Sequence, residues 1–157
     1  MSQIKIGKKI PGFTLPATGE QTISLSALKG KRVVLYFYPK DSTPGCTIEG
    51  RAFRDHVKKF RALNTVILGV SRDSLKSHEN FREKECFPFD LLSDADEKLC
   101  RMFDVIKEKN MYGRKVMGIE RSTFLIDENG ILRNEWRKVK VEGHVSEVLD
   151  AVRNLAQ

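Results

Sequence analysis

A short buried strand followed at once by a helix start constrains this chain more than any other feature. Residues 33–38 form an unbroken run of β-branched, aliphatic and aromatic side chains that ends at Pro39. Such a run predicts a strand covered on both faces, which is typical of the centre of an α/β sheet. Helix-capping residue types occupy positions 41–43, and apolar residues then recur at helical spacing as far as Leu63. The sequence therefore predicts a strand, a tight loop and an amphipathic helix in direct succession.

This loop brings a cysteine to the first turn of the predicted helix. Cys46 follows Thr43, Pro44 and Gly45, and Pro44 suits a first helical position. Unpaired backbone N–H groups and the positive end of the helix dipole favour an anion there, so a helix start favours a cysteine thiolate. The alternative is a small buried hydrophobe, which is how most free cysteines behave. We interpret Cys46 as a nucleophile because a loop-to-helix junction is a poor place to bury a thiol.

Five segments carry motifs that fit together along the chain. The first reads Tyr-Phe-Tyr-Pro-Lys-Asp-Ser-Thr-Pro-Gly-Cys-Thr-Ile-Glu over residues 36–49, followed by Phe-Arg-Asp at 53–55. The others lie at 69–73, 87–94, 118–127 and 136–144. These motifs cover nearly the whole chain and resemble the peroxiredoxins, specifically their bacterioferritin comigratory protein or peroxiredoxin Q branch. The resemblance implies a thioredoxin-like three-layer α/β sandwich with a central mixed sheet and an N-terminal β-hairpin. It also implies a hydroperoxide substrate.

The predicted elements alternate as an α/β sheet requires. Apolar runs and turn residues predict strands in a hairpin at 13–25, at 66–70 and 90–92, and in a second hairpin that turns at Asn129-Gly130. Helical spacing predicts a short turn at 26–30 and helices at 74–84, 95–103 and 145–155. Residues 107–117 are polar and lack a clean period, so we expect an irregular connection there.

Length and cysteine usage limit the class of protein. The chain has 157 residues, so we expect one domain over residues 1–157. It contains no apolar stretch near the ~18 residues of a membrane span and no leader with a cleavage site. Its three widely spaced cysteines argue against a disulfide framework and against a paired-cysteine zinc site. We therefore expect a cytoplasmic protein with reduced thiols.

The formal net charge of +7 raises the question of nucleic-acid or membrane binding. Basic residues are interleaved with acidic ones, and the densest basic cluster, residues 133–140, falls on a predicted edge strand, where charge discourages aggregation. We expect no nucleic-acid or membrane partner, and a monomer. We also expect no cofactor, since haem, flavin and metal motifs are absent and the histidines at 56, 78 and 144 lack ligand spacing. His144 is expected to cap a helix or lie on the surface.

Reduction of a hydroperoxide needs a thiolate and donors aimed at the reacting oxygens. The backbone N–H groups of Gly45 and Cys46 suit that role, and the Thr43 hydroxyl can point into the same pocket or simply cap the helix. The resemblance implies that Arg121, in an Arg-Ser-Thr-Phe motif, is the fixed cation of the site. Pro44 shields the sulfur, and Glu49 either steers Arg121 or is an exposed helix charge. The complete set of predicted catalytic residues is Cys46, Thr43, Arg121, Pro39, Pro44, Gly45 and Glu49.

Attack on a peroxide leaves a sulfenic acid that must condense with a second thiol. The two positions where the family carries a resolving cysteine hold Arg51 and Arg82 here. Cys86, four residues after Arg82, is a candidate displaced resolving cysteine or a helix-end packing residue, and Cys100 in an apolar helix is predicted to be core. We favour a single-cysteine peroxidase recycled by thioredoxin, glutaredoxin or a low-molecular thiol.

Two other functions remain open at this point. A redox-sensing interaction protein could use Cys46 oxidation as a signal without steady turnover. A thioredoxin-type disulfide reductase is less favoured, because Glu49 stands where a Cys-x-x-Cys motif has its second thiol.

Overall fold

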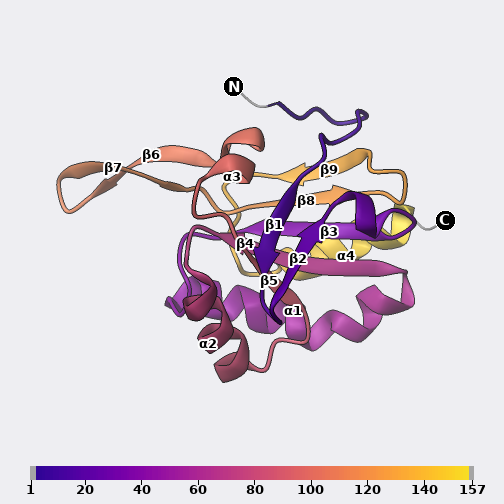
Figure 1. Cartoon of the computed structure of the whole chain (residues 1–157), viewed down its shortest axis with the longest axis horizontal. Coiled ribbons are helices and arrows are strands. Elements are labelled where there is room, and N and C mark those ends of the chain that lie inside the picture. The colour runs from indigo at the N-terminus through magenta and orange to yellow at the C-terminus, as the bar shows by residue number, and fades with distance from the viewer. Residues whose placement is uncertain (1–2, 156–157) are drawn as a thin grey trace.

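A seven-stranded mixed sheet forms the centre of the computed structural model, which describes residues 3–155 (Figure 1). The strand order is β2-β1-β5-β4-β3-β8-β9. Their bounds are β1 Thr14–Ala17, β2 Gln21–Ser24, β3 Arg32–Phe37, β4 Thr65–Ser71, β5 Asp90–Ser93, β8 Ser122–Ile126 and β9 Leu132–Trp136. Strand β3 pairs in parallel with β4 and antiparallel with β8, which makes the sheet mixed.

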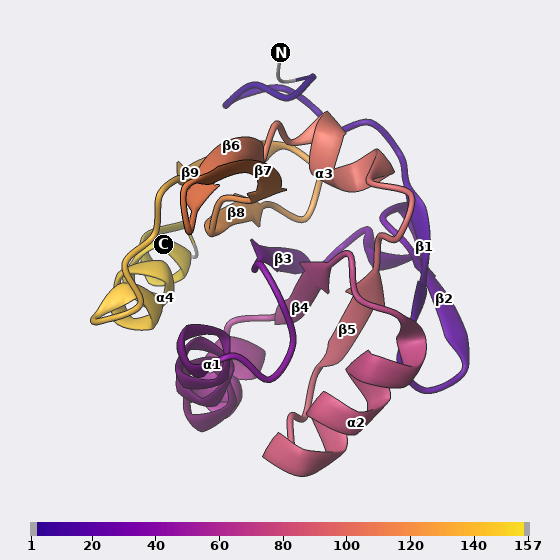
Figure 2. The same ribbon diagram turned by 90° about the vertical axis from the view of Figure 1, so that its left-hand side faces the viewer.

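Helices cover both faces of this sheet (Figure 2). The helices are η1 Ser26–Leu28, α1 Pro44–Ala62, α2 Leu75–Glu85, α3 Lys98–Met102 and α4 His144–Leu155. Figure 2 shows α1, α2 and α4 on one side of the sheet and α3 on the other. No helix in the described part of the chain is long and apolar enough to cross a membrane.

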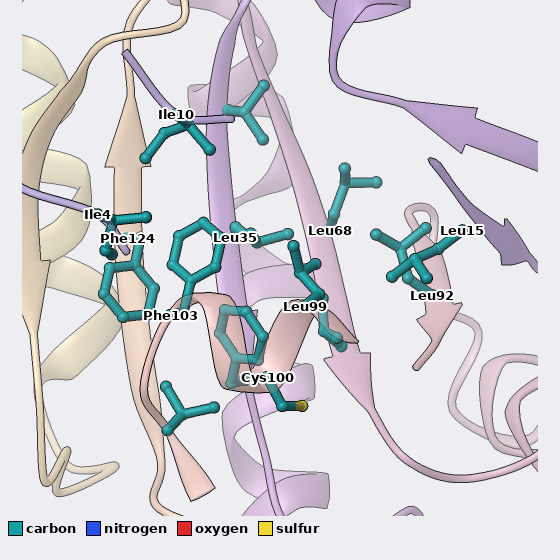
Figure 3. Packing of buried hydrophobic residues seen from close by; sticks show 14 of the residues in the cluster. Ile4, Ile10, Leu15, Leu35, Leu68, Leu92, Leu99, Cys100, Phe103 and Phe124 are labelled. Carbon is teal, nitrogen blue, oxygen red and sulfur yellow. The ribbon is translucent and has the colours of Figure 1, made fainter. Parts of the chain in front are cut away.

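The two faces bury separate hydrophobic clusters because successive side chains of a strand point in opposite directions. Val34 and Tyr36 of β3 pack in the cluster under α1 and α4. Leu35 and Phe37 pack in the other cluster, with Phe103 near α3, and Figure 3 shows part of that packing. Strand β3 is buried on both faces, as its sequence predicts.

Most predicted elements are present, including the N-terminal hairpin β1–β2 and the C-terminal hairpin β8–β9. The helix predicted at 95–103 is shorter, because the Asp94 carboxylate accepts the backbone N–H groups of Leu99 and Cys100 and so starts α3 later, at Lys98. Strand β9 lies at an edge of the sheet, as predicted.

The prediction of an irregular connection at 107–117 is wrong. Residues 106–119 form a second sheet, a hairpin of β6 (Ile106–Met111) and β7 (Arg114–Ile119). Its turn, Tyr112-Gly113, has positive φ at both residues, 54° and 79°, as a tight two-residue hairpin turn requires. Neither face of the hairpin is buried between its ends, so the sequence lacks the apolar alternation that marks a strand.

The C-terminal end of helix α2 is hydrogen-bonded to the first half of α1. The Glu85 carboxylate accepts a hydrogen bond from the Arg51 side chain at 2.5 Å, and the Glu85 carbonyl accepts one from Arg54 at 2.9 Å. Phe87 lies directly against Gly50, where an added Cβ would stand 2.3 Å from the phenyl ring. Gly50 therefore allows the chain after α2 to pack on α1, one helical turn beyond Cys46.

Candidate active site

Cys46 lies in the first turn of α1, as predicted. The expectation that this junction does not bury the thiol is wrong, because only 2% of the residue is exposed. The Thr47 N–H donates to the Thr43 carbonyl at 2.9 Å and makes the first bond of the helix. The N–H groups of Gly45 and Cys46 precede that bond and have no acceptor within the helix. They are therefore placed to donate to an oxygen atom near the sulfur.

Arg121 contacts both Cys46 and Glu49 of α1. One nitrogen of its guanidinium lies 3.4 Å from the Cys46 sulfur, and another donates to a Glu49 carboxylate oxygen at 2.6 Å. The Arg121 residue sits just before β8, which pairs with β3, the strand that leads to the Cys46 loop. Gly45 gives the guanidinium room, since a Cβ there would lie 3.0 Å from it.

Glu49 is fully buried, so the alternative of an exposed helix charge is wrong. Burial raises the pKa of Glu49 to about 7, although Arg121 acts to lower it. One Glu49 oxygen, Oε2, has no hydrogen-bond partner. The pKa of Arg121 is raised: burial would lower it, but Glu49 and Cys46 outweigh the burial. The site therefore contains a fixed cation beside a carboxyl group that titrates near neutral pH.

This titration predicts a pH-dependent effect of Glu49→Gln on stability. Between pH 4.5 and 7 the unfolded chain has released the Glu49 proton and the folded protein retains it, so Glu49 lowers the free energy of unfolding as pH rises. The shift corresponds to about 3 kcal/mol. Glu49→Gln should therefore match the wild type near pH 4.5 and become more stable than it by up to about that amount above pH 7. Urea unfolding across this range measures the difference.

The matched control for this prediction is Glu83→Gln, which changes an exposed carboxylate on α2. Its stability difference from the wild type should stay nearly constant with pH. The pKa of His144 is lowered to about 4 by burial and by Arg121, but His144 is present in every variant, so its contribution cancels in the comparison. A pH-independent difference for Glu49→Gln would contradict the assignment.

The other predicted site residues take different places. Thr43 is the N-cap residue of α1, but its hydroxyl makes no capping bond and donates instead to the Lys40 carbonyl at 2.8 Å. Pro44 is the first residue of α1, and Pro39 lies half-buried after β3. The structure thus brings Cys46, Gly45, Glu49 and Arg121 together, and it places the Thr43 hydroxyl on the loop backbone.

A buried polar network that the sequence did not reveal holds the loop before Cys46. Asp41 accepts hydrogen bonds from the Tyr38 hydroxyl at 2.6 Å and from Ser77 at 2.8 Å, and His78 Nδ1 lies 2.7 Å from it. The Asp41 N–H donates to Asp73 at 3.0 Å. The network fixes the loop against the start of α2, with Ser42 at a φ of 60°.

Asp41, Asp73 and His78 are close enough together to hold a cation. Each of the three side chains, however, already has hydrogen-bond partners: His78 Nδ1 lies 2.7 Å from Asp41, Asp73 accepts the Asp41 N–H at 3.0 Å, and His78 Nε2 lies 2.9 Å from the Leu92 carbonyl. We therefore assign the group a structural role. Tyr38 and Asp41 belong to the 36–49 motif, which is the sequence signal that could have found them.

His144 and Lys109 lie near the same centre. His144 is buried, which corrects the expectation of a surface group, and its Nε2 lies 2.8 Å from the Thr123 hydroxyl. The Lys109 side chain of β6 donates a hydrogen bond to the Ile119 carbonyl, two residues before Arg121. Burial and the charge of Arg121 lower the pKa of Lys109, whereas Cys46 acts to raise it. The base of the β6–β7 hairpin is therefore part of the surroundings of Cys46.

The remaining two cysteines lie outside this arrangement. Cys86 is the C-cap residue of α2, exposed and with a φ of 55°, and its sulfur faces the Glu83 carbonyl of its own helix at 3.8 Å. Cys100 is fully buried in the core, as predicted. Burial, followed by Asp94, raises the pKa of the Cys100 thiol, which makes it a poor nucleophile.

Known proteins resemble this chain in sequence and in fold. A profile of the AhpC/TSA family matches residues 6–135. Peroxiredoxin Bcp of Xanthomonas campestris pv. campestris is 57% identical over 144 residues, which cover 90% of this chain and 89% of that protein.

Two solved structures are similar as well. One belongs to the bacterioferritin comigratory protein of Xanthomonas campestris, solved to study its alkyl peroxide reduction activity, with a TM-score of 0.88, 54% identity and 92% of each chain covered. The other is a PrxQ mutant of Xylella fastidiosa, with a TM-score of 0.94, 45% identity and 100% of each chain covered.

Proposed function

The chain belongs to the AhpC/TSA family, as a thioredoxin-like thiol peroxidase of the Bcp or peroxiredoxin Q branch, and we propose that it reduces hydroperoxides through Cys46 as its only catalytic cysteine. Hydrogen peroxide and organic hydroperoxides are the proposed substrates. The activity of the Xanthomonas campestris relative towards alkyl peroxides supports the organic class.

One observation carries this proposal: the Arg121 guanidinium contacts both the Cys46 sulfur and the buried Glu49 carboxylate. A fixed cation beside a sulfur at a helix start favours the thiolate and holds it in one orientation. The same cation and the first-turn N–H groups can donate to a peroxide oxygen that gains negative charge. Glu49 positions Arg121, because it holds one guanidinium nitrogen at 2.6 Å while the other terminal nitrogen faces the sulfur.

The peroxide step forms one bond and breaks one. The Cys46 thiolate attacks the terminal oxygen of the hydroperoxide, so an S–O bond forms and the O–O bond breaks. The departing oxygen leaves with the electron pair and is protonated to an alcohol or to water, and Cys46 becomes a sulfenic acid. Thr43, Pro44 and Gly45 shape the loop before the sulfur, Thr43 through the bond from its hydroxyl to the Lys40 carbonyl.

We propose that an external thiol returns Cys46 to its reduced form. Arg51 and Arg82 occupy the positions of the family's resolving cysteines, and Cys86 lies at the far end of a helix that is fastened to α1. A disulfide needs Cα atoms within about 7 Å, so pairing Cys46 with Cys86 would require a helix end to unwind and the contacts of Glu85 to break. Thioredoxin, glutaredoxin and low-molecular thiols are the candidate reductants.

Treatment of the protein with one equivalent of peroxide tests this recycling mechanism. We expect a sulfenic acid or a mixed disulfide on Cys46, detected by intact mass and peptide mapping. The Cys86→Ser variant should turn over with dithiothreitol within about twofold of the wild type, because Cys86 is exposed and makes no contact with the site. A dominant peptide linking residues 46 and 86 would contradict the single-cysteine mechanism and assign resolution to Cys86.

The cellular setting is proposed on chemical grounds. All three cysteines are free thiols in the structure, which suits a reducing compartment such as the cytoplasm. The formal net charge of +7 makes two copies repel each other. We accordingly propose a cytoplasmic protein that acts as a monomer.

A further inference from the structure

Most of the exposed apolar side chains lie in three segments that adjoin the proposed catalytic site. Among residues 3–155, the large apolar side chains that are exposed are Ile6, Ile48, Leu75, Met111, Tyr112, Val116 and Met117. All but Ile6 come from three segments, the start of α1, the start of α2 and the β6–β7 hairpin. Because neighbouring residues of a strand point to opposite faces, Met117 lies on the other face of the hairpin from Val116 and Met111. The apolar group that marks an interaction surface is therefore Ile48, Leu75, Met111, Tyr112 and Val116.

These three segments meet around Cys46. Ile48 lies two residues after Cys46 on α1. The Arg72 side chain, three residues before Leu75, donates to the Met117 carbonyl of β7 at 3.4 Å. The Asp41 loop that leads to Cys46 is bonded to Asp73. Figure 2 views α1 nearly end-on and shows the β6–β7 hairpin above α1. Helix α2 lies beside α1 in the same view.

The hairpin reaches well beyond this centre. It projects from the body of the protein (Figure 1), and its strands of six residues extend about 20 Å from base to tip. Tyr112 at the tip is 100% exposed, and Met111 beside it is 51% exposed. A low-molecular thiol at Cys46 cannot contact this tip, so only a macromolecule can use the whole surface.

The charge of the hairpin limits what that macromolecule is. Residues 106–119 contain four basic side chains and one acidic side chain, Glu108. Arg72 and Arg121 at the base of the hairpin are paired with Glu97 and Glu49, and Lys107 is paired with Asp104, so the excess positive charge lies on the outer part of the hairpin. A second copy of the chain would bring two such basic surfaces together, which is unfavourable, whereas a partner with acidic residues around an apolar patch is attracted to it.

We propose that the β6–β7 hairpin, together with Ile48 and Leu75, is the docking surface for a dithiol protein reductant whose reactive thiol lies in an apolar patch with an acidic rim. The inference rests on the proposed function, because it concerns the recycling of Cys46. Only 2% of the Cys46 residue is exposed, so the first turn of α1 has to open before a partner thiol reaches the sulfur. A hairpin outside the main sheet keeps its shape while that turn opens, and so it can hold the partner in place.

The partner reduces the Cys46 sulfenic acid in two steps. The first thiol of the partner condenses with the Cys46 sulfenic acid, so an S–S bond forms and water leaves. The second thiol of the partner then attacks the partner's sulfur in that mixed disulfide. The bond to Cys46 breaks, Cys46 returns to the thiol, and the partner departs with an internal disulfide after supplying two electrons.

The test compares two reductants on the same variants. We expect Met111→Ser/Tyr112→Ser to lower kcat/KM for a thioredoxin of net negative charge by about tenfold, since truncated apolar anchors carry most of the energy of such contacts. Turnover with dithiothreitol should stay within about twofold of the wild type, because dithiothreitol does not contact the hairpin. Arg114→Glu/Lys115→Glu should likewise lower kcat/KM for thioredoxin and leave turnover with dithiothreitol unchanged. It should also weaken the dependence of the thioredoxin reaction on salt.

Matched controls lie on the far side of the molecule. Ile6→Ser removes an apolar side chain with the same exposed fraction as Met111, 51%, and Lys8→Glu reverses an exposed charge. Neither should alter kcat/KM for thioredoxin. If the wild type does not turn over with dithiothreitol, the proposed function itself is wrong. That result is distinct from a failure of the docking proposal, which affects the reaction with thioredoxin alone.

Three results would overturn the docking proposal. The first is an unchanged kcat/KM for thioredoxin in both hairpin variants. The second is a slower single-turnover reaction of Met111→Ser/Tyr112→Ser with a long-chain alkyl hydroperoxide, which would make the surface a substrate site. The third is a wild-type dimer that becomes a monomer in this variant, measured by light scattering, which would make the surface a contact between two copies.

Discussion

Replacing Cys46 with serine is expected to abolish peroxide consumption. A hydroxyl group is not ionised at neutral pH, so neither Arg121 nor the start of α1 can turn serine into an effective nucleophile. The substitution leaves the fold intact, because the serine oxygen fits the space of the sulfur and the helix keeps its first bond from Thr47 to Thr43. Single-turnover consumption of hydrogen peroxide should therefore fall to the rate of buffer alone, while circular dichroism and the free energy of unfolding change little.

The other two cysteines supply the controls for this prediction. Cys86→Ser should retain the full single-turnover rate, because Cys86 is exposed at the end of α2. Cys100→Ser should also retain it, with a loss of stability, because a hydroxyl replaces a thiol in the core. If Cys46→Ser keeps a substantial share of the wild-type rate, another group is the nucleophile and the proposed mechanism fails.

Local sequence patterns predicted much of the fold for one physical reason. A strand buried on both faces leaves a continuous apolar run, as in β3, and a helix with one buried face leaves apolar side chains near a period of 3.6, as in α1. The β6–β7 hairpin buries neither face, so its only signal was the two-residue turn at Tyr112-Gly113. A glycine after an aromatic residue is a weaker turn signal than Asn129-Gly130, which was recognised.

The site was predictable only in part. The position of Cys46 at a helix start follows from Pro39, Pro44 and the apolar spacing beyond them, all of which are local. Arg121 lies 75 residues away from Cys46 in sequence, and only the family resemblance selected it among the arginines of the chain. The burial of Glu49 was not predictable from its helix, because only tertiary packing brings Arg121, 72 residues away in sequence, against it.

The Asp41 network was likewise not predictable from the local sequence. Asp41 was interpreted as a helix-capping type because it precedes a helix, but its carboxylate faces Tyr38, Ser77 and His78. Tyr38 directly follows β3, whereas Ser77 and His78 belong to α2, and these segments are separated in sequence by α1 and β4 and meet only in the folded protein. Short-range spacing cannot report such a contact.

Removing the Arg121 side chain should have the second largest effect on the reaction. Arg121→Ala is expected to slow the single-turnover reaction with peroxide roughly a hundredfold, since one charge-assisted donor in a preorganised site contributes about 2 to 4 kcal/mol. The variant loses the contact with the Cys46 sulfur at 3.4 Å and leaves Glu49 without its ion-pair partner. Stopped-flow measurement of the second-order rate constant at several pH values checks the prediction.

Arg121→Lys is the matched variant that separates charge from geometry. An ammonium group keeps the positive charge but cannot hold the fork in which one nitrogen faces Cys46 and another faces Glu49, so its rate should fall between those of the wild type and Arg121→Ala. A second readout does not depend on activity. Arg121 and burial together lower the pKa of His144 to about 4, so in Arg121→Ala the pKa of His144 should rise, which NMR titration detects. If the rate constant stays unchanged while the pKa of His144 rises as expected, Arg121 lies where the structure places it but does not act on the sulfur. Another cation then assists the thiolate, and Lys109 is the first candidate.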